Sequence, residues 1–156
     1  MCFSYFDNLG NKVIDTSEGA AGAHGASHNF PVTLQNTEHP ISKGMPKVWM
    51  TGVDECYAKL RGPAENMTVL ATGKDQSKNT PTDRQEPVLM TIDYGKGRIF
   101  HNALGHDTDS FENVGFIVSF LRGTEWAASA KVTQDIPADF PTAQEPSQRI
   151  FELKSN

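Results

Sequence analysis

Apolar and polar residues alternate through the middle of this chain in a pattern that predicts a β-sheet and one amphipathic helix. Apolar residues recur at helical spacing after Asp107 and predict a helix that ends near Gly123, with a pattern that can resume through residues 124–129. Short runs rich in β-branched and aromatic residues predict strands, because such side chains suit a pleated, half-buried surface. These runs cover residues 30–34, 48–51, 67–72, 87–94 and 98–103.

The glycine turn at residues 94–98 joins the last two predicted strands. Two glycines in this short polar segment favour a tight turn, so residues 88–93 and 98–103 are predicted to form an antiparallel hairpin. The hairpin ends at Gly105, which places His106 and Asp107 at a strand end. Strand ends in α/β sheets open onto crevices, where such a pair can meet a ligand.

The remaining segments carry weaker patterns. Residues 1–30 are rich in small residues and are interpreted as loop, and the polar stretch 73–86 is interpreted as a surface loop. Residues 54–60 fit a helical turn or an irregular strand equally well. After Lys131 a polar, proline-containing segment either wraps the domain, with Phe140 and Ile150-Phe151 as anchors, or remains mobile. We therefore expect one domain over residues 1–130 and an extended tail over residues 131–156.

Composition and charge narrow the function classes. A chain of 156 residues with 37% hydrophobic content can bury the core of one ordinary domain. A formal net charge of −5 argues against nucleic acid or an anionic membrane as the main partner, because both are bound through clustered Lys and Arg. The N-terminus lacks the features of a signal peptide, so a cytoplasmic protein with a small polar ligand is expected. Cys2 and Cys56 are predicted to be free thiols.

Several short motifs occur in order between residues 30 and 128. They are Glu38-His39-Pro40-Ile41-Ser42-Lys43-Gly44-Met45-Pro46, Asp54-Glu55-Cys56-Tyr57, Val69-Leu70-Ala71-Thr72, Pro87-Val88-Leu89-Met90, and Tyr94-Gly95-Lys96-Gly97-Arg98-Ile99-Phe100 leading to Leu104-Gly105-His106-Asp107. Their order and intervals resemble the trehalose-utilisation, or ThuA-like, family. Cys56 departs from the leucine that is usual in the family's Asp-Glu-Leu-Tyr element.

The resemblance implies an α/β fold, namely a partial flavodoxin-like, class I glutamine amidotransferase-like domain with a mixed sheet and an antiparallel hairpin. Complete domains of this family begin with parallel strands and helices that include a Gly-Gly-rich turn, and residues 1–30 show no alternating βαβ pattern. The chain is therefore expected to correspond to the C-terminal portion of such a domain. A sheet edge left open would be covered by self-association, giving a homo-oligomer, or by a partner chain.

His106 and Asp107 are the leading catalytic candidates. Histidine exchanges protons near neutral pH, and a neighbouring carboxylate can orient or charge it. The resemblance also places His106 where the amidotransferase-like fold has its histidine. In the alternative interpretation, Asp107 caps the following helix and His106 fills a turn.

His24 and His28 are candidate metal ligands. Their spacing allows a loop to fold both imidazoles around a divalent ion such as zinc, with His106, Asp107 or Glu55 completing the site. The alternative is a glycine-rich surface loop without a metal, because Gly25 and Ala26 make a stable helix between the two histidines unfavourable.

Asp54, Glu55 and Tyr57 form a third cluster, able to accept hydrogen bonds from sugar hydroxyls. Glu55, if partly desolvated, can also move protons, which makes it a catalytic candidate. His39 is a further candidate for substrate binding, although its place before Pro40 also fits a turn. Adjacent acidic residues are commonly just solvated surface charge, and this alternative stays open.

Nucleophilic amidotransfer is not expected, because neither cysteine lies on a sharp strand-to-helix turn beside a histidine and an acid. The resemblance implies a link to carbohydrate catabolism. The available groups indicate proton transfer beside the carbonyl of a sugar or keto-sugar, with His106 and Glu55 as acid and base. The alternative is a noncatalytic carbohydrate-binding or assembly module, or an inactive fragment of a larger domain.

Overall fold

A five-stranded sheet in the order β5-β4-β7-β8-β9 is the main element of the computed structural model, which describes residues 4–14, 18, 22–60, 66–77 and 83–151. Each predicted strand is present, with boundaries shifted by about one residue. The strands are β4 (Pro31–Leu34), β5 (Val48–Met50), β7 (Met67–Gly73), β8 (Glu86–Tyr94) and β9 (Gly97–Asn102).

Each strand pairing described in this sheet is antiparallel. The predicted hairpin is confirmed, since Ile92 pairs with Ile99 and Tyr94 with Gly97. Gly95 closes the turn at φ +58°, in the left-handed region that glycine enters without strain. The α/β class and its antiparallel hairpin are thus confirmed, whereas no parallel pairing of the expected mixed sheet occurs among the described strands.

The single predicted helix is two helices, α1 (Thr108–Phe111) and α2 (Val114–Ser129). Asn113 interrupts them: it is buried, and its side chain caps α2 by accepting a 2.9 Å hydrogen bond from the N–H of Gly115. The apolar spacing runs through this break, so periodicity alone predicted one helix. The continuation past Gly123 is confirmed, because α2 extends to Ser129.

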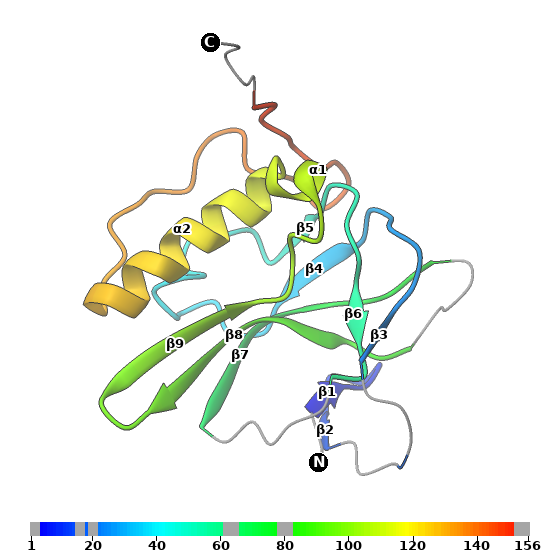
Figure 1. Ribbon diagram of the computed structural model, residues 1–156, viewed down its shortest axis with the longest axis horizontal. Coiled ribbons are helices and arrows are strands. Elements are labelled where there is room, and N and C mark those ends of the chain that lie inside the picture. Colours follow the sequence, from blue (N-terminus) through cyan, green and yellow to red (C-terminus); the bar gives the residue numbers. More distant parts are fainter. Residues whose placement is uncertain (1–3, 15–17, 19–21, 61–65, 78–82, 152–156) are drawn as a thin grey trace.

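The helix α2 lies across one face of the sheet (Figure 1). A Cβ at Gly123 would overlap the ring of Phe100 on β9, so glycine allows the close approach of helix and strand. The core lies between them and includes both tryptophans, which are 0% (Trp49) and 8% (Trp126) exposed. Neither tryptophan offers a ring face to a sugar.

Two small β-ribbons flank the sheet where the sequence predicts loop or leaves the structure open. In residues 1–30 the loop interpretation is wrong for β1 (Ser4–Phe6), β2 (Lys12–Ile14) and β3 (Ala23–His24). β1 pairs with β2, and β3 pairs with β6 (Tyr57–Ala58), which resolves the open assignment of residues 54–60 as a short strand. Strands of two or three residues are too short to show a period. Residues 15–17 and 19–21, also in the glycine-rich stretch, lie outside the described residues.

The stretch 73–86 is not wholly at the surface. Asp75 and Ser77 are 2% and 5% exposed, and Asp75 Oδ1 accepts a 2.9 Å hydrogen bond from the N–H of Ser77. The surface-loop interpretation is therefore wrong for this part. A polar composition concealed the burial because the buried groups satisfy one another by hydrogen bonds.

The tail runs back over the domain (Figure 1). Phe140 is buried and packs edge-on against Trp49, with ring centroids 5.6 Å apart, and the N–H of Met50 donates a 2.8 Å hydrogen bond to the carbonyl of Thr142. Phe140 is the anchor that the sequence predicts. Ile150 and Phe151 are not, since they are 79% and 59% exposed. The division into a domain over 1–130 and a tail over 131–156 stays a prediction.

Candidate functional site

The end of β9 presents His106 through a glycine in a left-handed conformation. Gly105 has φ +93°, and a Cβ at this position would lie 2.6 Å from Cε2 of Phe116. Both the backbone angle and the available space therefore require glycine. This turn directs the N–H groups of Gly105 and His106 toward Asp54.

Asp54 connects the strand end at Gly105 and His106 with the segment that carries Glu55. Its Oδ2 accepts a 2.8 Å hydrogen bond from the N–H of Gly105, and its Oδ1 accepts from the N–H groups of His106 (3.1 Å) and Glu55 (2.8 Å). The side chain is buried, at 2% exposure. A carboxylate whose oxygens already serve three backbone donors has little capacity left for sugar hydroxyls. Asp54 therefore positions the site, whereas the sequence analysis assigned it to substrate binding.

Glu55 lies between two imidazoles. Its Oε1 is 3.2 Å from Nδ1 of His24, and its Oε2 is 3.0 Å from Nδ1 of His106. The Glu55 side chain is 10% exposed, while each imidazole side chain is 43% exposed. Oε2 is buried and makes no well-directed hydrogen bond, so its contact with His106 is an ion-pair approach. Catalytic hydrogen bonds are often poorly aligned without substrate and tighten when it binds.

Tyr57 completes the cluster. Its hydroxyl is 3.1 Å from Nδ1 of His106. Partial burial raises the pKa of the phenol, and the charge of Glu55 and a hydrogen bond to that carboxylate raise it further. Tyr57 is therefore an uncharged phenol at neutral pH, able to donate one hydrogen bond and accept others.

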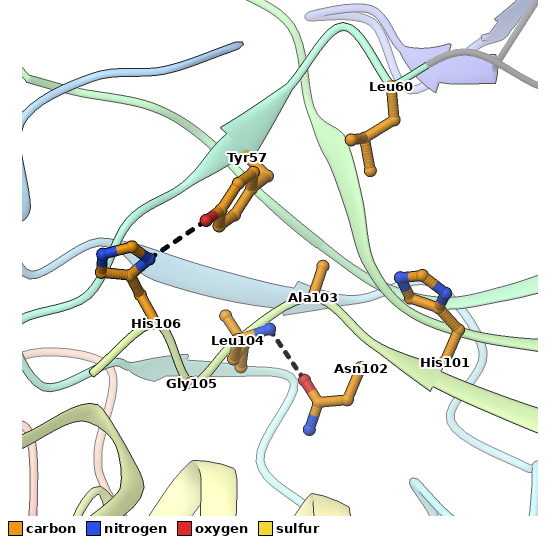
Figure 2. A pocket seen from close by; sticks show the side chains of 8 residues that line it. All are labelled: Tyr57, Leu60, His101, Asn102, Ala103, Leu104, Gly105 and His106. Carbon is orange, nitrogen blue, oxygen red and sulfur yellow. Dashed lines mark hydrogen bonds between the residues drawn. The ribbon is translucent and has the colours of Figure 1, made fainter. Parts of the chain in front are cut away.

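An open cavity of about 370 Å³ lies beside this cluster. Figure 2 shows Tyr57 and His106 at one end and Leu60 and His101 at the other, with the backbone of residues 102–105 forming the floor. Asn102 does not face a ligand freely, because its Oδ1 accepts from the N–H of Leu104 and its amide donates to Ser119. A concave site with apolar walls and a few converging polar groups is the usual form of a small-molecule site.

Asp107 has the capping role that the sequence analysis gave as its alternative. It is the N-cap of α1, and its Oδ1 accepts a 3.0 Å hydrogen bond from the N–H of Ser110. That bond is the main cause of the lowered pKa of the Asp107 carboxyl. His106 has the position expected of a site residue, since its ring contacts Glu55 and Tyr57. The pair predicted together is therefore divided between a structural and a site role.

His39 is not in this cluster. Its ring packs edge-on against Trp126, with centroids 4.9 Å apart, and its Nδ1 accepts a 3.2 Å hydrogen bond from the N–H of Ile41. Burial lowers the pKa of this imidazole, which favours the neutral ring. The structure thus gives His39 the turn-forming role, with no contact to the cavity residues among the described interactions.

The two candidate metal ligands separate. His24 contacts Glu55, whereas Nδ1 of His28 lies 2.9 Å from the carbonyl of Ala26 and its Nε2 accepts from the N–H of Gln76 at 3.1 Å. With both ring nitrogens of His28 engaged, that ring has no free lone pair for a metal. Within the described residues, no group of three or more His, Cys, Asp or Glu side chains is arranged to hold an ion. The zinc hypothesis stays a prediction that gains no support from this geometry.

One cavity residue escaped sequence analysis, and a second site residue was predicted only as a metal ligand. His101 lines the cavity from β9, and His24 reaches Glu55 through the pairing of β3 with β6. A signal for His101 was present, because it alternates with Phe100 and Asn102 on a predicted strand and so must face the side away from α2. His24 was predicted as a metal ligand with Glu55 among its possible partners, but the pairing of two-residue strands that produces this contact leaves no pattern in the sequence.

The comparisons with known proteins decide the family. The model of a family described as trehalose utilisation, ThuA, matches residues 12–127. This chain belongs to the ThuA family. A solved structure of a ThuA-like protein from Parabacteroides merdae is similar, with 40% sequence identity and a TM-score of 0.84. No curated protein matches the chain.

The similarity to the ThuA-like structure covers 94% of this chain and 55% of that protein, so the chain spans about half of the relative's length. The resemblance stated from the sequence motifs is confirmed, as is the fold class that it implied. None of the helices in the described part of the chain combines the length and apolar character needed to cross a bilayer.

Proposed function

We propose that this ThuA-family protein binds a sugar or keto-sugar in the cavity beside Tyr57 and transfers a proton at the carbon next to its carbonyl group. The observation that supports this proposal is the contact of His106 Nδ1 with both Glu55 Oε2, at 3.0 Å, and the Tyr57 hydroxyl, at 3.1 Å. A half-exposed imidazole held by a largely buried carboxylate is a common form of general base.

Each group has a distinct task in this reaction. Glu55 attracts the proton of His106 Nδ1, so Nε2 keeps its lone pair and can accept a proton from carbon. The Tyr57 hydroxyl, whose own proton is directed to Glu55, can accept a hydrogen bond from a hydroxyl group of the sugar. Asp54 fixes the backbone of both Glu55 and His106, so that the pair is preorganised before substrate arrives.

The environment of Cys56 argues against amide-transfer chemistry. This thiol is 1% exposed, and burial raises its pKa far above the ordinary value, with nearby acidic side chains adding to the effect. A nucleophilic cysteine needs an accessible thiolate. Cys56 has neither accessibility nor the thiolate form, so it acts as a core residue.

The test compares turnover with binding for four keto-sugars: D-fructose, D-tagatose, lactulose and isomaltulose. In His106→Ala and Glu55→Gln we expect turnover to fall by about 100-fold or more, which is the usual contribution of a general base. The affinity for the sugar, measured by titration calorimetry, is expected to change by less than about tenfold. Glu145→Gln, which removes an exposed carboxylate from the tail, is the matched control and keeps both values.

Absence of turnover by the parent protein on all four sugars contradicts the proposal. Binding without turnover would then favour the alternative of a noncatalytic carbohydrate-binding module, for which the cavity and its polar end are sufficient. A partner chain or second copy at the sheet edge is a separate prediction that this test does not address.

A further inference from the structure

His24 is fixed beside the candidate site by backbone pairing. In the β3–β6 ribbon, His24 is the direct partner of Tyr57, and opposed residues of an antiparallel pair present their side chains on the same face. The N–H of Gly22 donates a 2.9 Å hydrogen bond to the carbonyl of Lys59, which extends the pairing. The ring centroid of His24 lies 5.3 Å from that of Tyr57 and 6.1 Å from that of His106.

The neighbours of His24 indicate which ring nitrogen carries its proton. Nδ1 lies 3.0 Å from the carbonyl oxygen of Gly25 and 3.2 Å from Glu55 Oε1. Both oxygens are acceptors, so Nδ1 must be the donor. In the neutral ring, Nε2 is then left with a lone pair, and the 43% exposure of the side chain lets it reach a bound molecule.

Nδ1 of His106 lies 3.0 Å from Oε2, the other oxygen of the Glu55 carboxylate. Glu55 therefore orients two imidazoles in one way, with Nδ1 toward the carboxylate and Nε2 available on each. A single negative charge balances one imidazolium, whereas two cationic rings 6.1 Å apart would repel each other. The arrangement places two imidazoles on one carboxylate, which suits a pair in which one ring accepts a proton and the other donates one.

We propose that His24 is a second proton carrier and that the site catalyses isomerisation of a keto-sugar through an enediol. This inference rests on the proposed function and adds a reaction class and a catalytic residue to it. His24 does not line the cavity; it stands next to Tyr57 and His106, so the reacting carbonyl is bound at the rim between the two rings.

The proton balance of this reaction needs no further reactant. His106 Nε2 takes the proton of the carbon beside the carbonyl; the C–H electron pair forms the new C=C bond, and the carbonyl π pair moves to oxygen. The His24 imidazolium donates its proton to that oxygen, giving a neutral enediol. His24 then takes the proton of the neighbouring hydroxyl as that oxygen becomes the new carbonyl, and His106 returns a proton to the former carbonyl carbon.

The experiment follows each of the four keto-sugars in D₂O by NMR, recording deuterium entry into the starting ketose and its conversion to the isomeric aldose. In the parent protein both occur. His106→Gln lacks the carbon base and is expected to lose both by about 100-fold or more. His24→Gln keeps His106, the base that removes the proton from carbon. Conversion to the aldose is therefore expected to fall by about 100-fold while deuterium entry into the ketose falls less. The ratio of deuterium entry to conversion then rises at least about tenfold.

The possible failures are distinguishable. If His24→Gln leaves the ratio of deuterium entry to conversion unchanged while His106→Gln abolishes both, the role of His24 is rejected and the proposed function stands. If the parent protein shows neither process with any of the four sugars, the proposed function is rejected together with this inference. Melting temperatures within a few degrees of the parent show that each variant is folded.

Discussion

At the scale of single residues, Asp54 is the side chain on which the site geometry depends. Its carboxylate accepts hydrogen bonds from Gly105 and His106, which lie 51 and 52 positions further along the chain. Its burial at 2% exposure makes these bonds costly to lose, because a buried donor left without an acceptor keeps its full desolvation penalty.

Asp54→Asn should therefore destabilise the protein. The amide keeps one oxygen but presents an NH₂ group to at least one backbone donor, and we expect a loss of about 1–3 kcal/mol in the free energy of unfolding. Urea denaturation measures the loss. Asp93→Asn, at an exposed position on β8, is the control with no expected change. Equal stability of the two variants would show that Asp54 does not hold the site together.

Sequence and resemblance together predicted Glu55, Tyr57 and His106 as site residues, and the structure brings these three into contact. Glu55 was named as one possible partner of His24 in a metal site, but the pairing of two-residue strands that brings residues 24 and 55 together could not be predicted. For His39 and Asp107 the sequence left both a ligand role and a turn or capping role open. A histidine or aspartate at a turn has the same sequence appearance whether it serves a ligand or the local backbone.

At the scale of elements, the short helix α1 depends on the cap at Asp107. The depressed pKa of this carboxyl means that the folded state prefers its charged form. Its contribution to stability is then fully present above the ordinary carboxyl pKa of 3.8 and is lost as the pH falls through the lower value of the folded state.

Asp107→Ala should lower the free energy of unfolding by about 0.5–1 kcal/mol at neutral pH, the lower part of the range for N-caps because the side chain is exposed to solvent. The difference between parent and variant should be constant above about pH 5 and shrink below pH 4. Unfolding titrations at several pH values measure it. A difference independent of pH down to pH 2 would contradict the charged cap.

The contact of α2 with the sheet requires small residues. A Cβ at Gly115 would lie 2.7 Å from Cε3 of Trp49, closer than van der Waals contact allows. Sequence analysis predicted the helix from its apolar spacing, but periodicity cannot show which positions of a helix approach another element most closely. These positions are set by the volume of the facing side chains, here Trp49 and Phe100.

Gly115→Ala is therefore expected to destabilise the protein although alanine favours helices. Overpacking against the fully buried Trp49 should cost about 1–3 kcal/mol, more than the roughly 1 kcal/mol gained from helix propensity. Thermal unfolding provides the measurement, with Thr124→Ala on the exposed side of α2 as a control that changes little. A higher melting temperature for Gly115→Ala would mean that α2 does not pack this closely.

At the scale of the whole molecule, the tail and the sheet edge decide how the domain is enclosed. β9 is an edge strand, and edge strands offer unpaired backbone groups to other chains. A homo-oligomer or a partner chain at this edge stays a prediction, which size-exclusion chromatography with light scattering tests. At the opposite edge, β5 contacts the tail through the hydrogen bond that the N–H of Met50 donates to the carbonyl of Thr142.

Phe140→Ala should release this part of the tail. Removing a buried aromatic ring typically costs about 3–5 kcal/mol, and here we expect the lower end because the surrounding tail can relax. Limited proteolysis should then cleave within residues 131–151 at least about tenfold faster. Phe151→Ala, at a 59% exposed position, should leave the cleavage rate unchanged. Equal cleavage rates for the two variants would show that Phe140 is not the anchor.

The most direct test of the central claim is NMR of the five histidine rings, assigned by single His→Gln variants, during titration with the four keto-sugars. The account predicts that the ring signals of His24 and His106 shift with sugar concentration, while His39, packed on Trp126, does not respond. Saturable shifts at His39 with none at His106, or no shift at any ring, would contradict a ligand site built from Glu55, Tyr57 and His106.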